Sequence, residues 1–86
     1  MQLKYHDLSY CYANDNVEVC LSAAANVRLL DSNNFSKYRR GQRYQFHGGL
    51  ARQSPVVLSI PNSGHWYVVV DMQGLRGSAR YSVRKL

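Results

Sequence analysis

Acidic residues are scarce in this chain. Its 86 residues include five Asp and Glu against eleven Lys and Arg, which gives a formal net charge of +6. The five acids are scattered and form no pair with each other or with a nucleophile and base, so hydrolase and transferase chemistry lacks a recognisable centre. We therefore expect no enzymatic activity. The positive charge favours anionic partners, such as nucleic acid, nucleotides, acidic proteins or lipid head groups.

Cysteine is also scarce. Cys11 and Cys20 are too few for a disulfide framework and lack the CxxC or CxxH spacing of a zinc site, so we expect free thiols. The three histidines, His6, His47 and His65, have no local metal-ligand spacing either. We expect neither a metal nor another cofactor.

Long apolar runs are missing. No stretch of eighteen apolar residues occurs, and the first ten residues hold no apolar segment behind a basic start. We therefore expect no membrane span, no secretory signal, no membrane partner and a cytoplasmic location. The length fits a single domain over residues 1–86.

Helical periodicity is hard to find, whereas apolar residues alternate with a period of two almost everywhere. About seven short strands predict an all-β fold, either an antiparallel β-sandwich or a partly open barrel. Residues 32–42 are predicted as a loop with at most one short helical turn at Phe35–Tyr38. A strand is expected at residues 43–47, and an interruption at 48–55, where the two glycines are interpreted as a turn. An oxyanion loop there would need an accompanying GxSxG element, which is missing.

Residues 8–12 and 17–21 are predicted to form a hairpin around a turn at residues 15–16. In that register Cys11 faces Cys20. A cross-strand disulfide would then be geometrically conceivable, although a reducing cytoplasm disfavours it.

The segment HWYVVVDM at residues 65–72 is apolar on both parities, which is typical of a central strand covered on both sides. Trp66, Val68 and Val70 are predicted to face the core, because Asp71 lies on the other parity. The other residues expected in this core are Val19, Leu21, Leu58 and Tyr81.

Arginine makes up eight of the eleven basic residues. Its guanidinium suits phosphate and carboxylate oxygens, so two arginine groups are candidate ligand-binding sites. The first group, Arg76, Arg80 and Arg84, follows one side of a last strand predicted from about Ser78 to Arg84. The second group, in the long loop, consists of Arg39, Arg40 and Arg43, with Lys37 beside them.

The arginine row on the last strand has a second interpretation. Charge on an edge strand discourages edge-to-edge aggregation, and the row would then be a solvated face without a ligand. If the row and the loop group form a single site, they must lie within about one Debye length, roughly 8 Å at physiological salt.

Three segments, residues 25–49, 54–71 and 82–86, together resemble a bacterial family, the domain of unknown function eighteen-eighty-three. The most specific motifs are LLDSNNFSKYRRG and GHWYVVVD. The resemblance implies a compact β-sandwich-like domain, found alone or in front of TIR domains, with no assigned activity and no catalytic residue. Because bacterial TIR domains commonly consume NAD in defence against phage, the resemblance also implies a sensor or assembly role.

Two functions stay open. The first is an accessory binding module of a bacterial system, for example a TIR-linked anti-phage system, that acts through protein interaction or self-assembly. The alternative is a sensor of an anionic ligand, nucleic acid or nucleotide, through an arginine-rich face. Salt-insensitive self-association would favour the first, whereas neutralising Z phosphates of duplex DNA would give a log–log salt slope near about −0.9Z.

Overall fold

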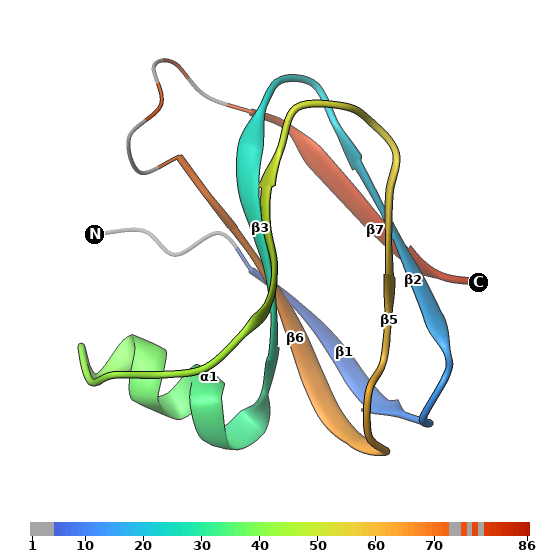
Figure 1. Cartoon of the computed structure of the whole chain (residues 1–86), viewed down its shortest axis with the longest axis vertical. Coiled ribbons are helices and arrows are strands. Elements are labelled where there is room, and N and C mark those ends of the chain that lie inside the picture. The colour runs from blue at the N-terminus through green and yellow to red at the C-terminus, as the bar shows by residue number, and fades with distance from the viewer. Residues whose placement is uncertain (1–4, 73–74, 76, 78) are drawn as a thin grey trace.

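The computed structural model describes residues 5–72, 75, 77 and 79–86. In this part of the chain, seven strands form two antiparallel sheets, and one helix follows the third strand (Figure 1). The fold is an all-β sandwich, as predicted, and neither sheet closes into a barrel. The elements are β1 (Tyr5–Cys11), β2 (Asn16–Leu21), β3 (Ala25–Asp31), α1 (Ser32–Arg39), β4 (His47–Ala51), β5 (Val56–Ser59), β6 (Gly64–Asp71) and β7 (Tyr81–Lys85).

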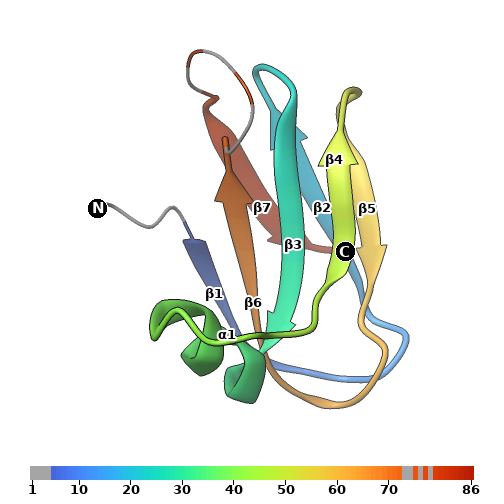
Figure 2. The same ribbon diagram turned by 60° about the vertical axis from the view of Figure 1, so that its left-hand side comes forward.

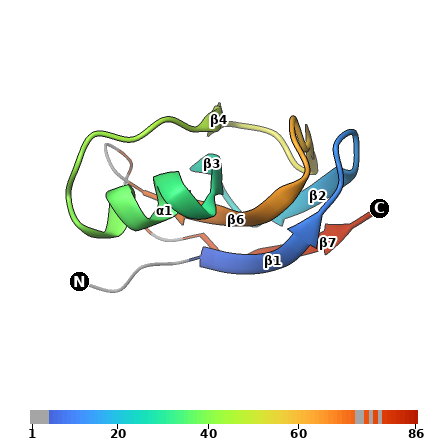
Figure 3. The ribbon, with the colours of Figure 1, turned by 90° about the horizontal axis from the view of Figure 1, so that it is seen from below.

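The strand order is β1-β6-β3-β4 in one sheet and β5-β2-β7 in the other. The two sheets face each other, and α1 lies on the outer side of the four-stranded sheet (Figures 2 and 3). Among the described strands, β3 and β4 are the only consecutive pair that share a sheet. Every other connection crosses between the layers.

The core lies between the two sheets and is centred on β6. Trp66, Val68 and Val70 are buried there together with Val19, and Leu21, Leu58 and Tyr81 pack against them, as predicted. The opposite face of β6 is covered too, because Val69 is buried under α1 with Leu30 and Phe35. The apolar residues on both parities of β6 therefore indicated its position correctly.

The predicted hairpin of β1 with β2 is wrong. β1 pairs with β6 in the four-stranded sheet, whereas β2 pairs with β5 and β7 in the other. Residues 12–15 instead carry the chain from one sheet to the other. Their fold is fixed by a hydrogen bond from Tyr12 N to Asp15 Oδ2 (2.9 Å) and by backbone bonds that join Asn14 and Asp15 to Ile60 (both 2.8 Å).

A bulge in β1 explains why strict alternation misled the prediction. The register shifts between Asp7 and Ser9, and Ser9 has a φ of 60°. Leu8 and Cys11, three positions apart, both face the core, whereas Tyr10 is 54 % exposed. A bulge adds one residue to a strand and so reverses the parity beyond it.

The two cysteines consequently lie in different sheets. Cys11 is fully buried in β1, whereas Cys20 is exposed in β2 opposite Ser82, so the predicted Cys11–Cys20 register is wrong. Burial raises the pKa of the Cys11 thiol, which disfavours the reactive thiolate.

We expect Ellman's reagent to modify one thiol quickly in the folded protein. That thiol is Cys20, and Cys11 should react only as the chain unfolds, because the buried thiol is inaccessible and protonated. Stopped-flow absorbance on Cys20→Ser should show loss of the fast phase, and Cys11→Ser should retain it. Two fast thiols in the parent protein would contradict the structure.

The segment after β3 differs from its prediction. It forms the eight-residue helix α1 rather than one turn, and Asp31 caps it by accepting a hydrogen bond from Asn34 N at 2.8 Å. The strand predicted at 43–47 is wrong, since the strand is β4 at 47–51 and contains both glycines. Gly48 has a φ of +111°, and a Cβ there would lie 2.3 Å from Val27 O, so glycine is needed for this close pairing.

The last strand is confirmed with shifted bounds. It runs over Tyr81–Lys85, and its alternation is as predicted, since Tyr81 and Val83 pack against the core while Arg80 and Arg84 are exposed. Residues 76 and 78 of the predicted row lie outside the described residues.

Candidate functional site

Helix α1 rests on an aromatic layer over the outer face of the four-stranded sheet. Phe35, the buried residue of the helix, stacks on Tyr67 of β6 with ring centroids 4.0 Å apart and an interplanar angle of 10°. His65 stacks on Tyr67 at 4.8 Å, and Tyr5 of β1 lies 4.9 Å from Phe35. Three elements thus contribute rings to one layer.

An open pocket of about 390 Å³ borders this layer. Ser36 follows Ser32 by four positions, and Arg39 and Arg40 follow Ser36 by three and four. This spacing places these residues on one side of α1. We call this surface the α1 shelf. Its lining residues are Ser32, Phe35, Ser36, Arg39, Arg40 and Tyr67.

Local contacts orient both arginines of the α1 shelf. The Arg39 guanidinium lies 5.8 Å from the centroid of the Phe35 ring, a cation–π geometry. Arg40 Nε donates a hydrogen bond to the Ser36 carbonyl at 3.4 Å, at the C-terminal end of α1. Both arginines thus line one pocket together with two serines and two aromatic residues, an arrangement that suits an anion.

Nearby acids are engaged elsewhere. Asp31 caps α1, and Asp7 accepts a hydrogen bond from His65 Nε2 at 2.6 Å. The Ser9 N–H, which donates to Asp7 at 2.7 Å, lowers the pKa of Asp7, and the bond with His65 adds to this effect. Within the described part of the chain, the ion pairs do not involve Arg39 or Arg40. Their positive charge is thus available to a ligand.

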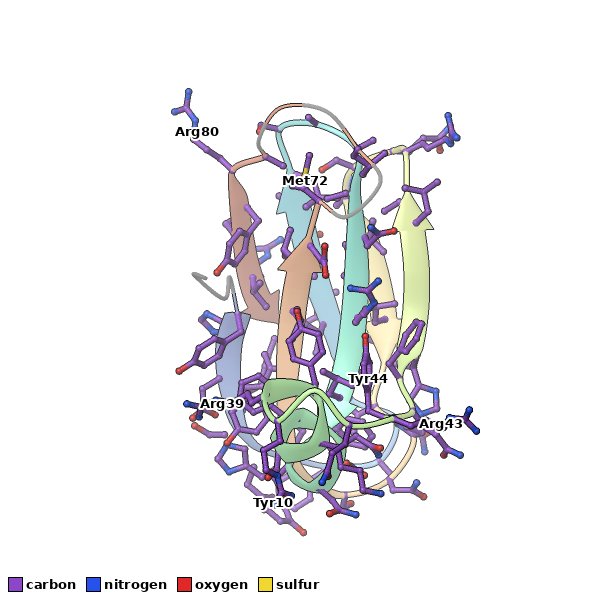
Figure 4. All side chains as sticks on the ribbon, turned by 90° about the vertical axis from the view of Figure 1, so that its left-hand side faces the viewer. Tyr10, Arg39, Arg43, Tyr44, Met72 and Arg80 are labelled. Atoms are coloured by element: carbon purple, nitrogen blue, oxygen red, sulfur yellow. The ribbon has the colours of Figure 1, made fainter. Side chains whose placement is uncertain are left out.

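The structure brings together only part of the predicted arginine set. Arg39 and Arg40 share the α1 shelf, whereas Arg43 lies on the other side of α1 (Figure 4). Arg80 is at the opposite end of the sandwich from Arg39 and Arg43 (Figure 4), so it does not share a site with them. Arg84 lies on edge strand β7 and pairs with Glu18 at 2.8 Å. Arg76 lies outside the described residues.

A second polar cluster on the same face has a structural explanation. Arg28 pairs with Asp71 at 2.7 Å, and their side chains are 13 % and 20 % exposed. The Arg28 guanidinium lies 5.4 Å from the centroid of the Phe46 ring, and Tyr38 packs beside Tyr44. Burial raises the pKa of Tyr38, and Asp71 raises it further. These contacts hold the segment between α1 and β4 against the sheet.

The histidines do not converge on a metal site in the described residues, where no group of three His, Cys, Asp or Glu side chains could hold an ion. His65 pairs with Asp7, and the His47 ring lies 6.0 Å from that of Trp66. Helix α1 is far too short to cross a membrane, and no other helix occurs in the part of the chain that the structure describes.

Sequence reasoning missed the serines and the aromatic floor of the α1 shelf. The signal was the helical spacing of Ser32, Ser36 and Arg40, which the loop interpretation of that segment concealed. The contribution of Tyr67 had no local signal, because β6 is remote from α1 in the sequence.

Comparisons with curated proteins and with solved structures gave no match. A protein-family model, described as a domain of unknown function (DUF1883), matches residues 1–86. The resemblance seen in the sequence agrees with this match. The chain belongs to the DUF1883 family.

Proposed function

We propose that this domain is a non-enzymatic binding module that takes an anionic ligand on the α1 shelf. The observation that carries the proposal is the convergence of Arg39 and Arg40 with two serine hydroxyls on a pocket floored by aromatic rings. Arginine donors bind phosphate oxygens with charge-assisted hydrogen bonds, and serine hydroxyls add neutral donors.

The ligand class that fits best carries both phosphate and a flat ring. The pocket, at about 390 Å³, lies in the size range of small-molecule sites. Tyr5 is 42 % exposed and His65 is exposed beside the pocket, so ring surface lies next to positive charge. Proteins that bind single-stranded nucleic acids combine positive charge with exposed rings in this way. The combination favours a nucleic acid or nucleotide over a simple inorganic anion as the ligand.

Two double variants with equal charge loss test the α1 shelf against the β7 arginines. Arg39→Gln/Arg40→Gln should weaken binding of a fluorescein-labelled single-stranded oligonucleotide by about tenfold or more, because charge-assisted hydrogen bonds are lost. Arg80→Gln/Arg84→Gln removes the same charge from β7 and should change the affinity much less. Fluorescence anisotropy at several salt concentrations measures both, with ATP as competitor.

Chemical denaturation provides the control for folding. Each variant should keep its free energy of unfolding within about ±0.5 kcal/mol per site, since these side chains are exposed. Equal losses of affinity in the two variants would show general charge attraction and refute a site on the α1 shelf.

A specific observation also favours the protein-interaction role. Edge strands β4 and β5 border one open groove, and Leu50, which helps to line it, is 47 % exposed. Such a surface suits self-assembly or an accessory role beside a bacterial effector such as a TIR protein. Gene neighbourhoods test the accessory role: a TIR or other effector domain encoded alongside supports it, and neighbourhoods without one refute it.

A further inference from the structure

Among the strands that the structure describes, four lie at sheet edges, and three of these carry features that discourage pairing with another chain. Edge strands expose unpaired backbone N–H and C=O groups, and proteins commonly protect them with bulges, charge or proline. β1 has the bulge at Ser9, β7 carries Arg84 and Lys85, and the four-residue β5 follows Pro55.

β4 lacks all three kinds of protection. Its sequence, HGGLA, contains no proline, acid, lysine or arginine, and its pairing with β3 is regular from Ala25↔Ala51 to Leu29↔His47. Exposed apolar side chains accompany it: Leu50 is 47 % exposed, and Phe46, just before the strand, is 43 % exposed.

The groove beside β4 adds an open surface that is partly apolar. It has a volume of about 570 Å³ and runs between β4 and β5, where Val27, Val56 and Leu58 contribute to its lining. A Cβ on Gly49 would meet nothing within 4 Å, so the inner side of β4 leaves space open to the groove.

We propose that β4 pairs antiparallel with β4 of a second copy of this chain, around a two-fold axis at Gly49. The two four-stranded sheets then become one continuous sheet. The pairing is self-complementary, as a two-fold interface requires. Leu50 of each copy lies opposite Gly48 of the other, where the missing side chain leaves room for it.

The flanking residues favour a second copy as the occupant. In this register Arg52 of one copy lies opposite Phe46 of the other, on both sides of the axis. The Arg28 guanidinium already lies 5.4 Å from the centroid of the Phe46 ring. Phe46 is still 43 % exposed, so a second cation can bind its ring.

The pairing leaves the α1 shelf open. Arg39 lies on the side of α1 away from Arg43 (Figure 4), and the segment after Arg43 leads to β4. A two-fold axis perpendicular to the joined sheet puts both helices on the same face. The dimer would thus present two α1 shelves on one face of the joined sheet.

The dependence on salt concentration distinguishes dimerisation through β4 from anion binding on the α1 shelf. Each copy carries a net charge of +6, so like-charge repulsion opposes dimerisation and screening should strengthen it. Binding of an anion to the α1 shelf should weaken with salt instead. Either proposal can therefore fail while the other holds.

The test is sedimentation equilibrium of the full chain over a range of protein and salt concentrations, without nucleic acid. The parent protein should form a dimer that tightens as salt rises. Leu50→Lys should be monomeric, whereas Val57→Lys, the same kind of change on β5, should still dimerise. A monomeric parent protein, or equal effects of the two substitutions, would overturn the proposal.

Arg52→Gln tests the register without disturbing a buried residue. The substitution removes one positive charge from each copy. If charge repulsion alone limited dimerisation, the substitution would strengthen it. With Arg52 facing Phe46 of the second copy, the substitution should instead weaken dimerisation severalfold. Stronger dimerisation of Arg52→Gln would refute the pairing around Gly49.

Discussion

Replacement of Trp66 by Ala is expected to lower the free energy of unfolding by about 3–5 kcal/mol. Trp66 is 4 % exposed in the middle of β6, where it packs in the core with Val68 and Val70. Its Nε1–H also donates to the Asn62 carbonyl at 2.7 Å, and the truncation removes that bond. The loss approaches the whole stability of a domain of this size, which is about 5–15 kcal/mol.

Urea denaturation followed by far-UV circular dichroism measures this effect, because the substitution removes the only tryptophan and with it the fluorescence signal. Val57→Ala is the matched control. Val57 is 53 % exposed on β5, so its truncation should change the free energy of unfolding by no more than about 0.5 kcal/mol. A loss below about 1 kcal/mol for Trp66→Ala would show that Trp66 is not central to the core.

Truncation of Phe35 should separate α1 from the sandwich and eliminate ligand binding. Phe35 is 5 % exposed and stacks on Tyr67 at 4.0 Å, and it is the buried anchor of α1. Phe35→Ala should cost about 3–5 kcal/mol of packing. A helix of eight residues does not persist in water without such packing, so the Arg39 and Arg40 side chains would lose their fixed positions.

Hydrogen exchange and anisotropy together measure that outcome. Amides of residues 34–39 should exchange far faster in Phe35→Ala, and oligonucleotide affinity should fall with them. Arg39→Gln is the comparison: its affinity should fall while exchange stays at the parent level. Protected α1 amides in Phe35→Ala would contradict the anchoring role of Phe35.

Sequence patterns located strands that no bulge interrupts. β6 followed from apolar residues on both parities, and β7 from the contrast of Tyr81 and Val83 with Arg80 and Arg84. β1 was misassigned because the bulge at Ser9 reverses its parity, and a bulge leaves no reliable local mark. β4 was missed because paired glycines usually indicate a turn, whereas here Gly48 permits close contact with Val27 of β3.

The candidate site could be predicted only as a cluster of charge. Adjacent arginines at 39 and 40 were visible in the sequence, but their location on a helix was not. Whether Arg39 and Arg80 share one site stayed open at that stage, because sequence alone does not say at which end of a strand a remote loop lies. The aromatic floor required knowing that β6 runs beneath α1, a long-range contact between segments about thirty residues apart.

The way the strands alternate between the two sheets also determines when the chain can fold. β1 cannot pair until β6 exists, and β2 must wait for β5 and β7. Folds built on such remote pairings close their loops slowly, typically on the scale of milliseconds to seconds. On the ribosome, β2 stays unpaired until residues 56–59 have emerged and β1 until residues 64–71 have emerged, so neither sheet can be complete before those segments are available.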